Sequence, residues 1–512
     1  MDARSSRKAL NARRALVAAA LCAVLALVYW RAPRMQFLHL DDYTAIVDNP
    51  RLNPPSLAGI PFFWRSAHMN LYVPMPYTAW ELVALSAGHP VQGSARWEFP
   101  PGAFHLVNVA LHAACAWLAF MLMRRLVASD AAALAGTALF ALHPLQVEAV
   151  AWSMGLRDLL CAAFSLLALL GYLRFAARDQ RTRARGAWEY TWASIAYLSA
   201  LASKPSAVVV PLFALLVGLA AFERVDRRRL SALLPWAAIA IAWTVLTHAV
   251  QALTSVHPLA AWTRPLVAGD ALAFYLWKLA VPLELCVDYG RTPERVVGHT
   301  WGWLTWLAPA ALAALVIWKR KDWPRVAIVA GLFAAGVLPV LGFVPFAFQW
   351  MSTVGDRYAY MSMLGPALGV AWWLAEHPTR IAWSLAAAVL ALLAFASERQ
   401  TRFWVDDRAC FEHTLAVNPE SFVSQGYLGV IYAGEGRTRE AVEAYERALQ
   451  GNPNDLRTRI NLAYALATVG RTDDAIRELE RALSTGLQDP QAERYLDVLR
   501  ARRREADATR AK

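Results

Sequence analysis

Two adjacent carboxylates follow the first apolar segment of the chain. Asp41 and Asp42 lie in a short polar stretch, residues 38–44, soon after an apolar run that ends at Trp30. A carboxylate at a membrane face can act as a base that takes a proton from an acceptor hydroxyl, and a pair can ligate a divalent cation such as Mg²⁺ or Mn²⁺. A solvated loop or the N-cap of the following helix would use the same residues. The chemistry therefore depends on what the fold brings near them.

A second polar cluster interrupts the apolar segments further along the chain. His143 and Glu148 lie where two short apolar runs meet, and Arg157 and Asp158 follow. A charge at the centre of a membrane costs roughly 2.5–3.5 kcal/mol, so these two ions need partners or a water-filled cavity. Neighbouring residues of a helix do not face each other. Arg157 and Asp158 are therefore expected to pair with different groups, either in structural ion pairs between helices or in a site.

Two further cations interrupt later apolar segments. Lys204 precedes a proline, and Arg357 lies between Asp356 and Tyr358 before a late apolar run. Together with Arg157, the expected topology brings three cations to one leaflet, where they can neutralise a lipid phosphate. Each cation alone could instead extend to the lipid headgroups. Their coincidence on one side, together with the acidic residues there, favours a site.

Histidines and cysteines give weaker signals. His105 lies near the outer end of its apolar run and can line the mouth of a cavity, whereas His112, roughly two helical turns later, is better explained as a hydrogen-bonded interior residue. The five cysteines form no CxxC pair and no ligand spacing typical of a metal cluster. Only Cys286 and Cys410 are expected on the oxidising side, where a disulfide between them is an open alternative.

The elements that must position these residues are membrane helices. Of the 512 residues, 57% are hydrophobic and 22 are tryptophan, which is too apolar for a soluble multidomain protein. We expect an all-α fold, a polytopic helical membrane bundle followed by a short α-solenoid. The eleven expected spans cover residues 15–30, 103–123, 126–142, 159–173, 190–201, 207–222, 230–250, 301–318, 326–343, 358–374 and 381–395. Several are shorter than the roughly 20 residues of a straight span, so their ends must extend into flanking polar residues or line cavities.

Basic residues set the expected orientation of this bundle. The net charge of +12 comes from Arg and Lys grouped in short connections, which is a topology signal and argues against nucleic-acid binding. The basic residues 1–14 precede an apolar run without a small-residue cleavage site, so we expect an uncleaved anchor with a cytoplasmic N-terminus. Residues 268–283 carry Asp270 and Lys278. If this segment lies on the outer surface instead of crossing the membrane, all basic clusters lie on the cytoplasmic side. The outer side then contains the loop 31–102, the loop 251–300 and the region after residue 396.

The C-terminal region repeats itself with a period of 34 residues. Asn418 recurs as Asn452, and Gly436 recurs as Gly470. This is the period of the tetratricopeptide repeat, in which pairs of short helices stack on their neighbours and usually bind peptide or protein on a concave face. The expected boundaries are 15–397 for the membrane domain, 398–500 for the repeats, with a partial unit at 404–419 and units at 422–455 and 456–489, and 501–512 for a charged tail.

In combination, these residues resemble the transmembrane and tetratricopeptide-repeat containing proteins. The likeness rests on Leu-Asp-Asp-Tyr at residues 40–43, His-Leu-Val-Asn at 105–108, the segment 143–152 with the following Arg-Asp, Ser-Lys-Pro at 203–205, Val-Asp-Tyr-Gly at 287–290 and Asp-Arg-Tyr at 356–358. It covers nearly the whole chain, repeats included. That family belongs to the integral-membrane glycosyltransferases of the GT-C class, and its animal members are linked to protein O-mannosylation.

The resemblance implies inverting transfer of a mannose-like hexose from a polyprenyl-phosphate donor at the non-cytoplasmic face. By analogy, Asp42 is the base, Asp41 is its support or a ligand of Mg²⁺ or Mn²⁺, and the three cations contact the donor phosphate. Those cations are Arg157, Lys204 and Arg357. Supporting roles fall to His105, His143, Glu148, Asp158, Asp356 and Tyr358. The acceptor would be a protein or glycan hydroxyl presented by the repeats.

The repeat array is shorter than the fuller family pattern, with about two and a half units, so it can grip only a short acceptor segment. The compact, Ala- and Arg-rich chain is typical of a bacterial protein. This places it in the inner membrane, with undecaprenyl phosphate as the lipid and the repeats in the periplasm.

Two other function classes stay open. A membrane-anchored scaffold would recruit envelope proteins through the repeats without catalysis, but it would not need the outward-facing charges. A transporter of lipid-linked saccharide would show inverted repeats and ionisable residues at the midplane, and neither is evident in the sequence.

Overall fold

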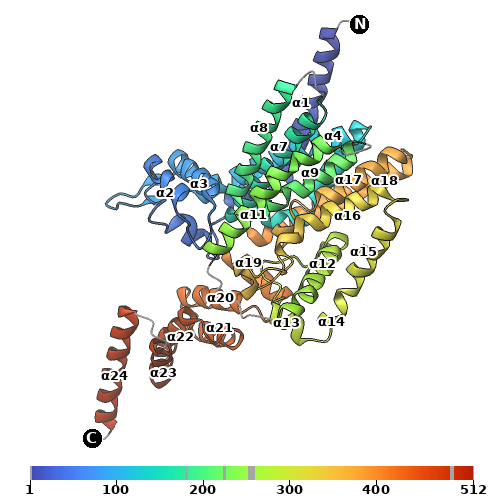
Figure 1. Ribbon diagram of the computed structural model, residues 1–512. Helices are drawn as coiled ribbons and strands as arrows, with labels where there is room; N and C mark the ends of the chain where they lie inside the picture. The colour runs from blue at the N-terminus through green and yellow to red at the C-terminus, as the bar shows by residue number, and fades with distance from the viewer. Residues whose placement is uncertain (1–2, 179–182, 223–225, 252–259, 485–488, 511–512) are drawn as a thin grey trace. The chain divides into compact units, whose positions relative to one another are not determined.

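The computed structural model describes residues 3–178, 183–222, 226–251, 260–484 and 489–510 (Figure 1). Within these ranges the fold is helical, with strands only at β1 (His89–Pro90) and β2 (Trp97–Glu98), which form a small antiparallel hairpin. The expected all-α class is confirmed. Parts of five expected segments lie outside the described residues, namely the segments 1–14, 174–185, 251–300, 456–489 and 501–512.

The chain divides into two compact units. Unit 1 comprises Met1–Val287 and Arg291–Asp406, and unit 2 comprises Asp288–Gly290 and Asp407–Lys512. The main helices of unit 1 are α1 (Ala3–Val28), α2 (Ile60–Arg65), α3 (Pro74–Ala87), α4 (Pro101–Leu126), α5 (Asp130–Leu142), α6 (Val147–Ala151), α7 (Leu156–Ala176), α8 (Arg183–Ser203), α9 (Val210–Ala221), α10 (Arg227–Ser231), α11 (Leu233–Val250), α12 (Arg264–Ala280), α13 (Pro293–Gly298), α14 (Gly302–Thr305), α15 (Leu307–Lys319), α16 (Pro324–Val337), α17 (Leu364–Glu376) and α18 (Arg380–Thr401).

Unit 1 contains the helices that can cross a membrane. Five described segments are long and apolar enough, namely Pro101–Leu126, Ser153–Ala176, Arg227–Val250, Gly302–Lys319 and Arg380–Trp404. A sixth is added if Asp130–Leu142 and Pro144–Ala151, which meet at a bend of 54°, form one span. The chain is thus a multi-pass membrane protein, but the expected eleven spans are not confirmed among the described residues. Several expected spans form helices that are too short by themselves, such as α17 with 13 residues.

Helix α7 forms the core of unit 1. In the span Ser153–Ala176, 78% of the most apolar window is buried, against 11% for the span Arg380–Trp404. Helix α7 packs against α4, α8 and α9. A Cβ atom on Gly171 of α7 would lie only 2.8 Å from the Cβ of Ala193 in α8, and such contacts between small residues let membrane helices approach closely. The close packing of α7 therefore fixes the backbone positions of Arg157 and Asp158 at its N-terminal end.

The segment between α1 and α4 folds back onto this core. It contains the helical turn η2 (Tyr43–Val47), helices α2 and α3, and the hairpin of β1 and β2. Helix α3 begins with Pro74, whose fixed φ suits the first turn of a helix, and it packs against α4, α7 and α8. The loop 31–102, named the first loop from here on, is therefore a structured part of unit 1 next to the start of α7.

Unit 2 is a stack of short helices, each packed against the next. Gly429 makes room for the ring of Tyr445, because a Cβ atom there would lie 2.5 Å from that ring. Gly436 and Gly470 follow equivalent helices with φ of +75° and +84°, the left-handed conformation that ends a helix. The 34-residue spacing thus places a glycine at the end of each of two equivalent helices. The helices are α19 (Asp407–Val417), α20 (Phe422–Gly434), α21 (Thr438–Gly451), α22 (Leu456–Thr468), α23 (Thr472–Leu483) and α24 (Pro490–Arg510).

Candidate functional site

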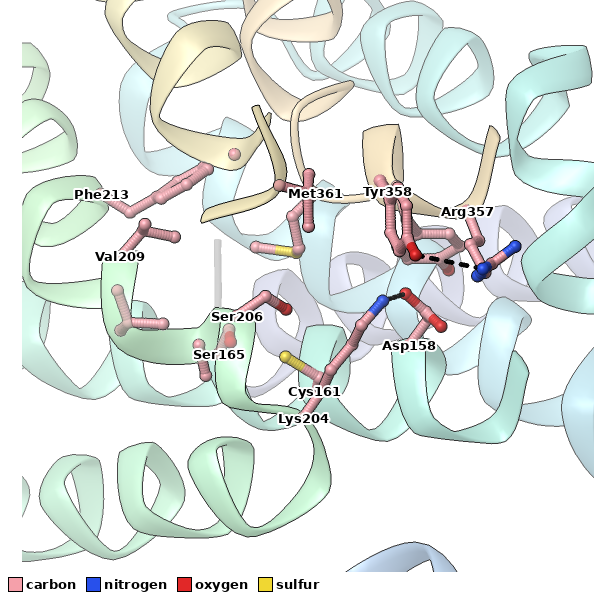
Figure 2. A pocket seen from close by; sticks show the side chains of 15 residues that line it. Asp158, Cys161, Ser165, Lys204, Ser206, Val209, Phe213, Arg357, Tyr358 and Met361 are labelled. Carbon is pink, nitrogen blue, oxygen red and sulfur yellow. Dashed lines mark hydrogen bonds and ion pairs between the residues drawn. The ribbon is translucent and has the colours of Figure 1, made fainter. Parts of the chain in front are cut away.

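A cavity in unit 1 is lined by residues from several separate elements (Figure 2). Asp158 lies in α7, Lys204 precedes the turn η7 (Pro205–Val209), and Arg357 and Tyr358 lie in the turn η11 (Asp356–Ala359). The opposite wall carries the apolar side chains of Val209, Phe213 and Met361 (Figure 2). Val210 and Val340 also line the cavity. The cavity has a volume of about 30 Å³, which is room for roughly two waters. A sugar phosphate could enter only if the walls separate.

Lys204 and Asp158 form an ion pair at the polar end of this cavity. Their side chains are 17% and 8% exposed, so the pair is largely shielded from solvent. The ammonium group of Lys204 also lies 4.9 Å from the centroid of the Tyr358 ring, where the negative face of an aromatic ring attracts a cation. Lys204 is therefore held by a carboxylate and an aromatic ring that both line the cavity.

Arg357 is held by Glu148 of α6 through two groups. The guanidinium forms an ion pair with Glu148 Oε1, and the backbone N–H of Arg357 donates to Glu148 Oε2 at 2.8 Å. The guanidinium also donates to the Tyr358 hydroxyl at 3.1 Å and lies 4.2 Å from the centroid of Phe348. Because the side chains of both Arg357 and Glu148 are buried, the orientation of the guanidinium is fixed.

The two first-loop carboxylates have different environments. Asp41 Oδ2 lies 3.8 Å from Arg157 Nη2, and the Asp41 side chain is 42% exposed. Asp42 is fully buried, and its Oδ2 accepts a hydrogen bond from the backbone N–H of Leu38 at 2.9 Å. Asp41 therefore connects the loop 31–102 to the start of α7, whereas Asp42 holds the backbone of that loop.

Two residues of α3, Tyr77 and Glu81, were missed by the sequence reasoning. Burial raises the pKa of Tyr77 to about 12, while the charge of Arg157 lowers this pKa and that of Asp41 raises it. Burial also raises the pKa of Glu81 to about 7, although the backbone N–H of Ser56 donates to its Oε1 and acts in the opposite direction. Glu81 is the single acidic residue in α3. That isolation within an apolar helix was the available signal.

The expected supporting residues have separate positions. His105 is buried, with Nε2 at 3.2 Å from the Gln36 carbonyl oxygen and 3.3 Å from Ser153 Oγ. His143 Nδ1 accepts from the backbone N–H of Leu145 and thereby caps the turn η4 (Pro144–Gln146). Asp356 is buried in η11. None of these three expected residues is part of the cavity lining given above.

The described residues do not form a metal-binding cluster. Within these residues, no group of three His, Cys, Asp or Glu side chains could hold a metal ion. The Asp41 carboxylate meets a guanidinium and Asp42 accepts from a backbone N–H, so the pair does not present a joint set of ligands. A divalent cation stays a prediction from the sequence and enters no step below. No disulfide joins Cys286 and Cys410 among the described residues, so that alternative is not supported.

Comparisons with known proteins agree with this organisation. Two tetratricopeptide repeat family models match residues 408–455 and 432–503. The O-mannosyl-transferase Tmtc1 of Drosophila melanogaster is 47% identical over 74 residues, which are 14% of this chain and 9% of that protein. Tmtc2 of the same fly is 34% identical over 221 residues, 40% of this chain and 23% of that protein.

A longer match extends through most of the chain. The protein O-mannosyl-transferase TMTC4 of Mus musculus is 24% identical over 468 residues, which are 79% of this chain and 62% of that protein. The chain thus spans less than two thirds of the length of these curated relatives. The likeness noted in the motifs is confirmed. With tetratricopeptide repeats after a multi-pass membrane region and matches to several such proteins, the chain is similar to the transmembrane and tetratricopeptide-repeat containing proteins.

Proposed function

We propose that the protein is a membrane glycosyltransferase that moves a mannose-like hexose from a polyprenyl-phosphate donor to a hydroxyl of a protein or glycan at the non-cytoplasmic face. The observation that carries this proposal is the cavity at which Lys204 and Arg357, far apart in the sequence, lie at one polar end opposite an apolar wall. The relatives named O-mannosyl-transferases support the same reaction class.

The two ends of the cavity suit the two parts of such a donor. Lys204 and Arg357 are cations that can bind phosphate oxygens, and the guanidinium offers a planar pair of donors. The wall formed by Val209, Val210 and Phe213 suits the first isoprene units of the lipid. Since both cations already have carboxylate partners, the phosphate must share or replace those partners. In this proposal Asp158 and Glu148 hold the cations in place until the donor arrives.

Burial distinguishes the two first-loop carboxylates as candidate bases. Asp41 is 42% exposed and can meet an acceptor, whereas Asp42 is fully buried. We therefore assign Asp41 as the base and Asp42 as the residue that shapes its loop, which reverses the roles expected from the sequence. The positive charge of Arg157, whose Nη2 lies 3.8 Å from Asp41 Oδ2, holds the Asp41 carboxylate in its orientation.

The proposed reaction is a single displacement at C1 of the hexose. The acceptor oxygen forms a bond to C1 of the hexose while the bond between C1 and the phosphate oxygen breaks, which inverts the configuration at C1. The acceptor proton passes to Asp41, and the electron pair of the broken bond leaves with the polyprenyl phosphate. The added negative charge on that phosphate develops next to Lys204 and Arg357, where it is stabilised.

The repeats, which are protein-interaction modules, would present the acceptor on the periplasmic side of a bacterial inner membrane. Purified protein in lipid bilayers, given undecaprenyl-phosphate mannose and envelope proteins, should transfer mannose as detected by mass spectrometry. A non-catalytic scaffold would instead bind the same envelope proteins through the repeats and leave the donor unchanged.

A further inference from the structure

A tight turn in the first loop combines a strained backbone with exposed apolar side chains. Met69 and Asn70 have φ of +50° and +56°, and the flanking residues His68 and Leu71 exchange backbone hydrogen bonds of 2.9 and 3.0 Å. A two-residue turn with both central φ values positive favours Asn or Gly, and a Met at the first position is disfavoured by its Cβ. The turn therefore holds a large apolar side chain at its tip against the local backbone preference.

The side chains around this turn are those that favour a membrane surface. Met69 is 37% exposed and Trp64 is 44% exposed. The Trp64 indole donates to Thr78 Oγ1 at 3.0 Å, and the Tyr72 hydroxyl donates to the Trp64 carbonyl oxygen at 2.9 Å. These hydrogen bonds fix the orientation of the aromatic rings while leaving the Trp64 ring accessible. Trp and Tyr are enriched at the level of lipid headgroups, where an apolar ring and a polar group are both satisfied.

A contact with α11 places the turn beside a membrane span. The rings of Tyr72 and Trp243 have centroids 5.8 Å apart. Trp243 lies seven residues before the end of the span Arg227–Val250, which is roughly 10 Å along a helix. Only 17% of the apolar window of that span is buried within the protein, and its neighbours Ile241 and Val245 are 68% and 65% exposed. Ile241 and Val245 share one face of α11, which must face lipid, whereas Trp243 lies on another face. The contact with Trp243 therefore places Tyr72 of the turn beside the span.

We propose that the segment Trp64–Tyr72 is a membrane anchor, with Met69 and Trp64 inserted into the outer interface of the phospholipid bilayer. The anchor would fix the first loop at the membrane surface, because Phe63, next to Trp64, stacks on Tyr77 with ring centroids 4.3 Å apart. Tyr77 in turn lies within the electrostatic influence of Arg157 and Asp41. The inference does not depend on the proposed sugar transfer.

Site-directed spin labelling tests this anchor. The full-length protein would carry Cys22→Ser, because Cys22 is the exposed cysteine among the five, together with Met69→Cys or Trp64→Cys. Ser94→Cys is the matched control, since Ser94 lies in the exposed turn between β1 and β2 of the same loop. Each labelled protein in phosphatidylglycerol and phosphatidylethanolamine nanodiscs is exposed to oxygen, which concentrates in lipid, and to a nickel chelate, which stays in water.

The anchor predicts that labels at positions 69 and 64 collide several-fold more often with oxygen than with the nickel chelate, and that the label at position 94 shows the reverse. Labels at 69 and 64 that are as accessible to the chelate as the label at 94 would overturn the proposal. Protection of positions 69 and 64 from both reagents would also overturn it, because a protein surface, such as a second copy of the chain, would then cover the turn. A melting temperature equal to that of the Cys22→Ser parent shows that each labelled variant is folded.

Discussion

Arg157 Nη2 lies 3.8 Å from Asp41 Oδ2, so the loop 31–102 is joined to the N-terminal end of α7 by a pair of opposite charges. The next residue of α7, Asp158, forms an ion pair with Lys204 in the cavity wall. Two consecutive residues of one helix thus connect the proposed base to the proposed phosphate-binding group. The site therefore forms only when the bundle folds, because Asp41, Arg157 and Lys204 come from distant segments of the chain.

Exchanging each first-loop carboxylate for its amide should separate catalysis from stability. Asp41→Asn should lower turnover by about 10²–10⁴-fold, the usual contribution of a general base, with little change in melting temperature. Asp42→Asn should destabilise the loop by about 1–3 kcal/mol, because the buried acceptor for the Leu38 N–H is weakened. Initial rates of mannose transfer and thermal unfolding of both variants provide the measurement. The opposite pattern would return the role of base to Asp42.

Replacing the Lys204–Asp158 pair should uncouple stability from donor binding. Lys204→Met leaves Asp158 largely buried without its partner, which should cost roughly 3–5 kcal/mol of stability. The double variant Lys204→Met with Asp158→Leu should regain most of that stability, yet it should still bind undecaprenyl-phosphate mannose weakly. Thermal unfolding and donor titration distinguish the two effects. A double variant that transfers mannose at the parental rate would mean that Lys204 is only a structural cation.

The geometry of Arg357 should matter beyond its charge. Arg357→Lys keeps a cation, but it loses the planar group that contacts Glu148 and Tyr358. Loss of one hydrogen bond to a charged partner costs about 1.5–3 kcal/mol, so KM for the donor should rise by about tenfold or more. Tyr358→Phe is the milder comparison, because it removes only the hydroxyl that accepts from Arg357. If Arg357→Lys left KM unchanged, the phosphate would not be bound by this guanidinium.

Glu81 should make the stability of the first loop depend on pH. Because burial raises its pKa from 4.5 to about 7, the folded loop favours the protonated carboxyl. The stability that this preference contributes is fully present below about pH 4.5 and is lost as the pH rises to about 7. Glu81→Gln stays uncharged and should remove this part of the pH dependence. Limited proteolysis of the loop between pH 4.5 and 8 compares the two proteins, and parallel profiles would show that Glu81 does not titrate in that range.

The sequence predicted individual pairings better than it predicted burial. Adjacent positions on a helix implied that Arg157 and Asp158 would find different partners, and the structure confirms this with Asp41 and Lys204. The period of the repeats likewise predicted unit 2, because local glycines and helix lengths determine that arrangement. These features depend on neighbours in the sequence or on a repeated local pattern.

Features that depend on distant contacts could not be predicted in the same way. The burial of Asp42 follows from how the loop folds, with its carboxylate against the Leu38 N–H, and hydropathy does not report it. The raised pKa of Glu81 also results from tertiary burial. The expected eleven spans assumed that each apolar run crosses the membrane separately, whereas several of the runs form short or bent helices.

The most direct test of the account is mannose transfer by the purified protein in lipid bilayers, with undecaprenyl-phosphate [¹⁴C]mannose as donor and envelope proteins as acceptors. The account predicts that label appears in protein or glycan with the parental chain, and that Asp41→Asn, with the same melting temperature and membrane insertion, transfers almost none. Transfer at an equal rate by both proteins would contradict the assignment of Asp41 as the base. If the parental chain transferred no label but still bound the envelope proteins, the enzymatic account would give way to a membrane-anchored scaffold.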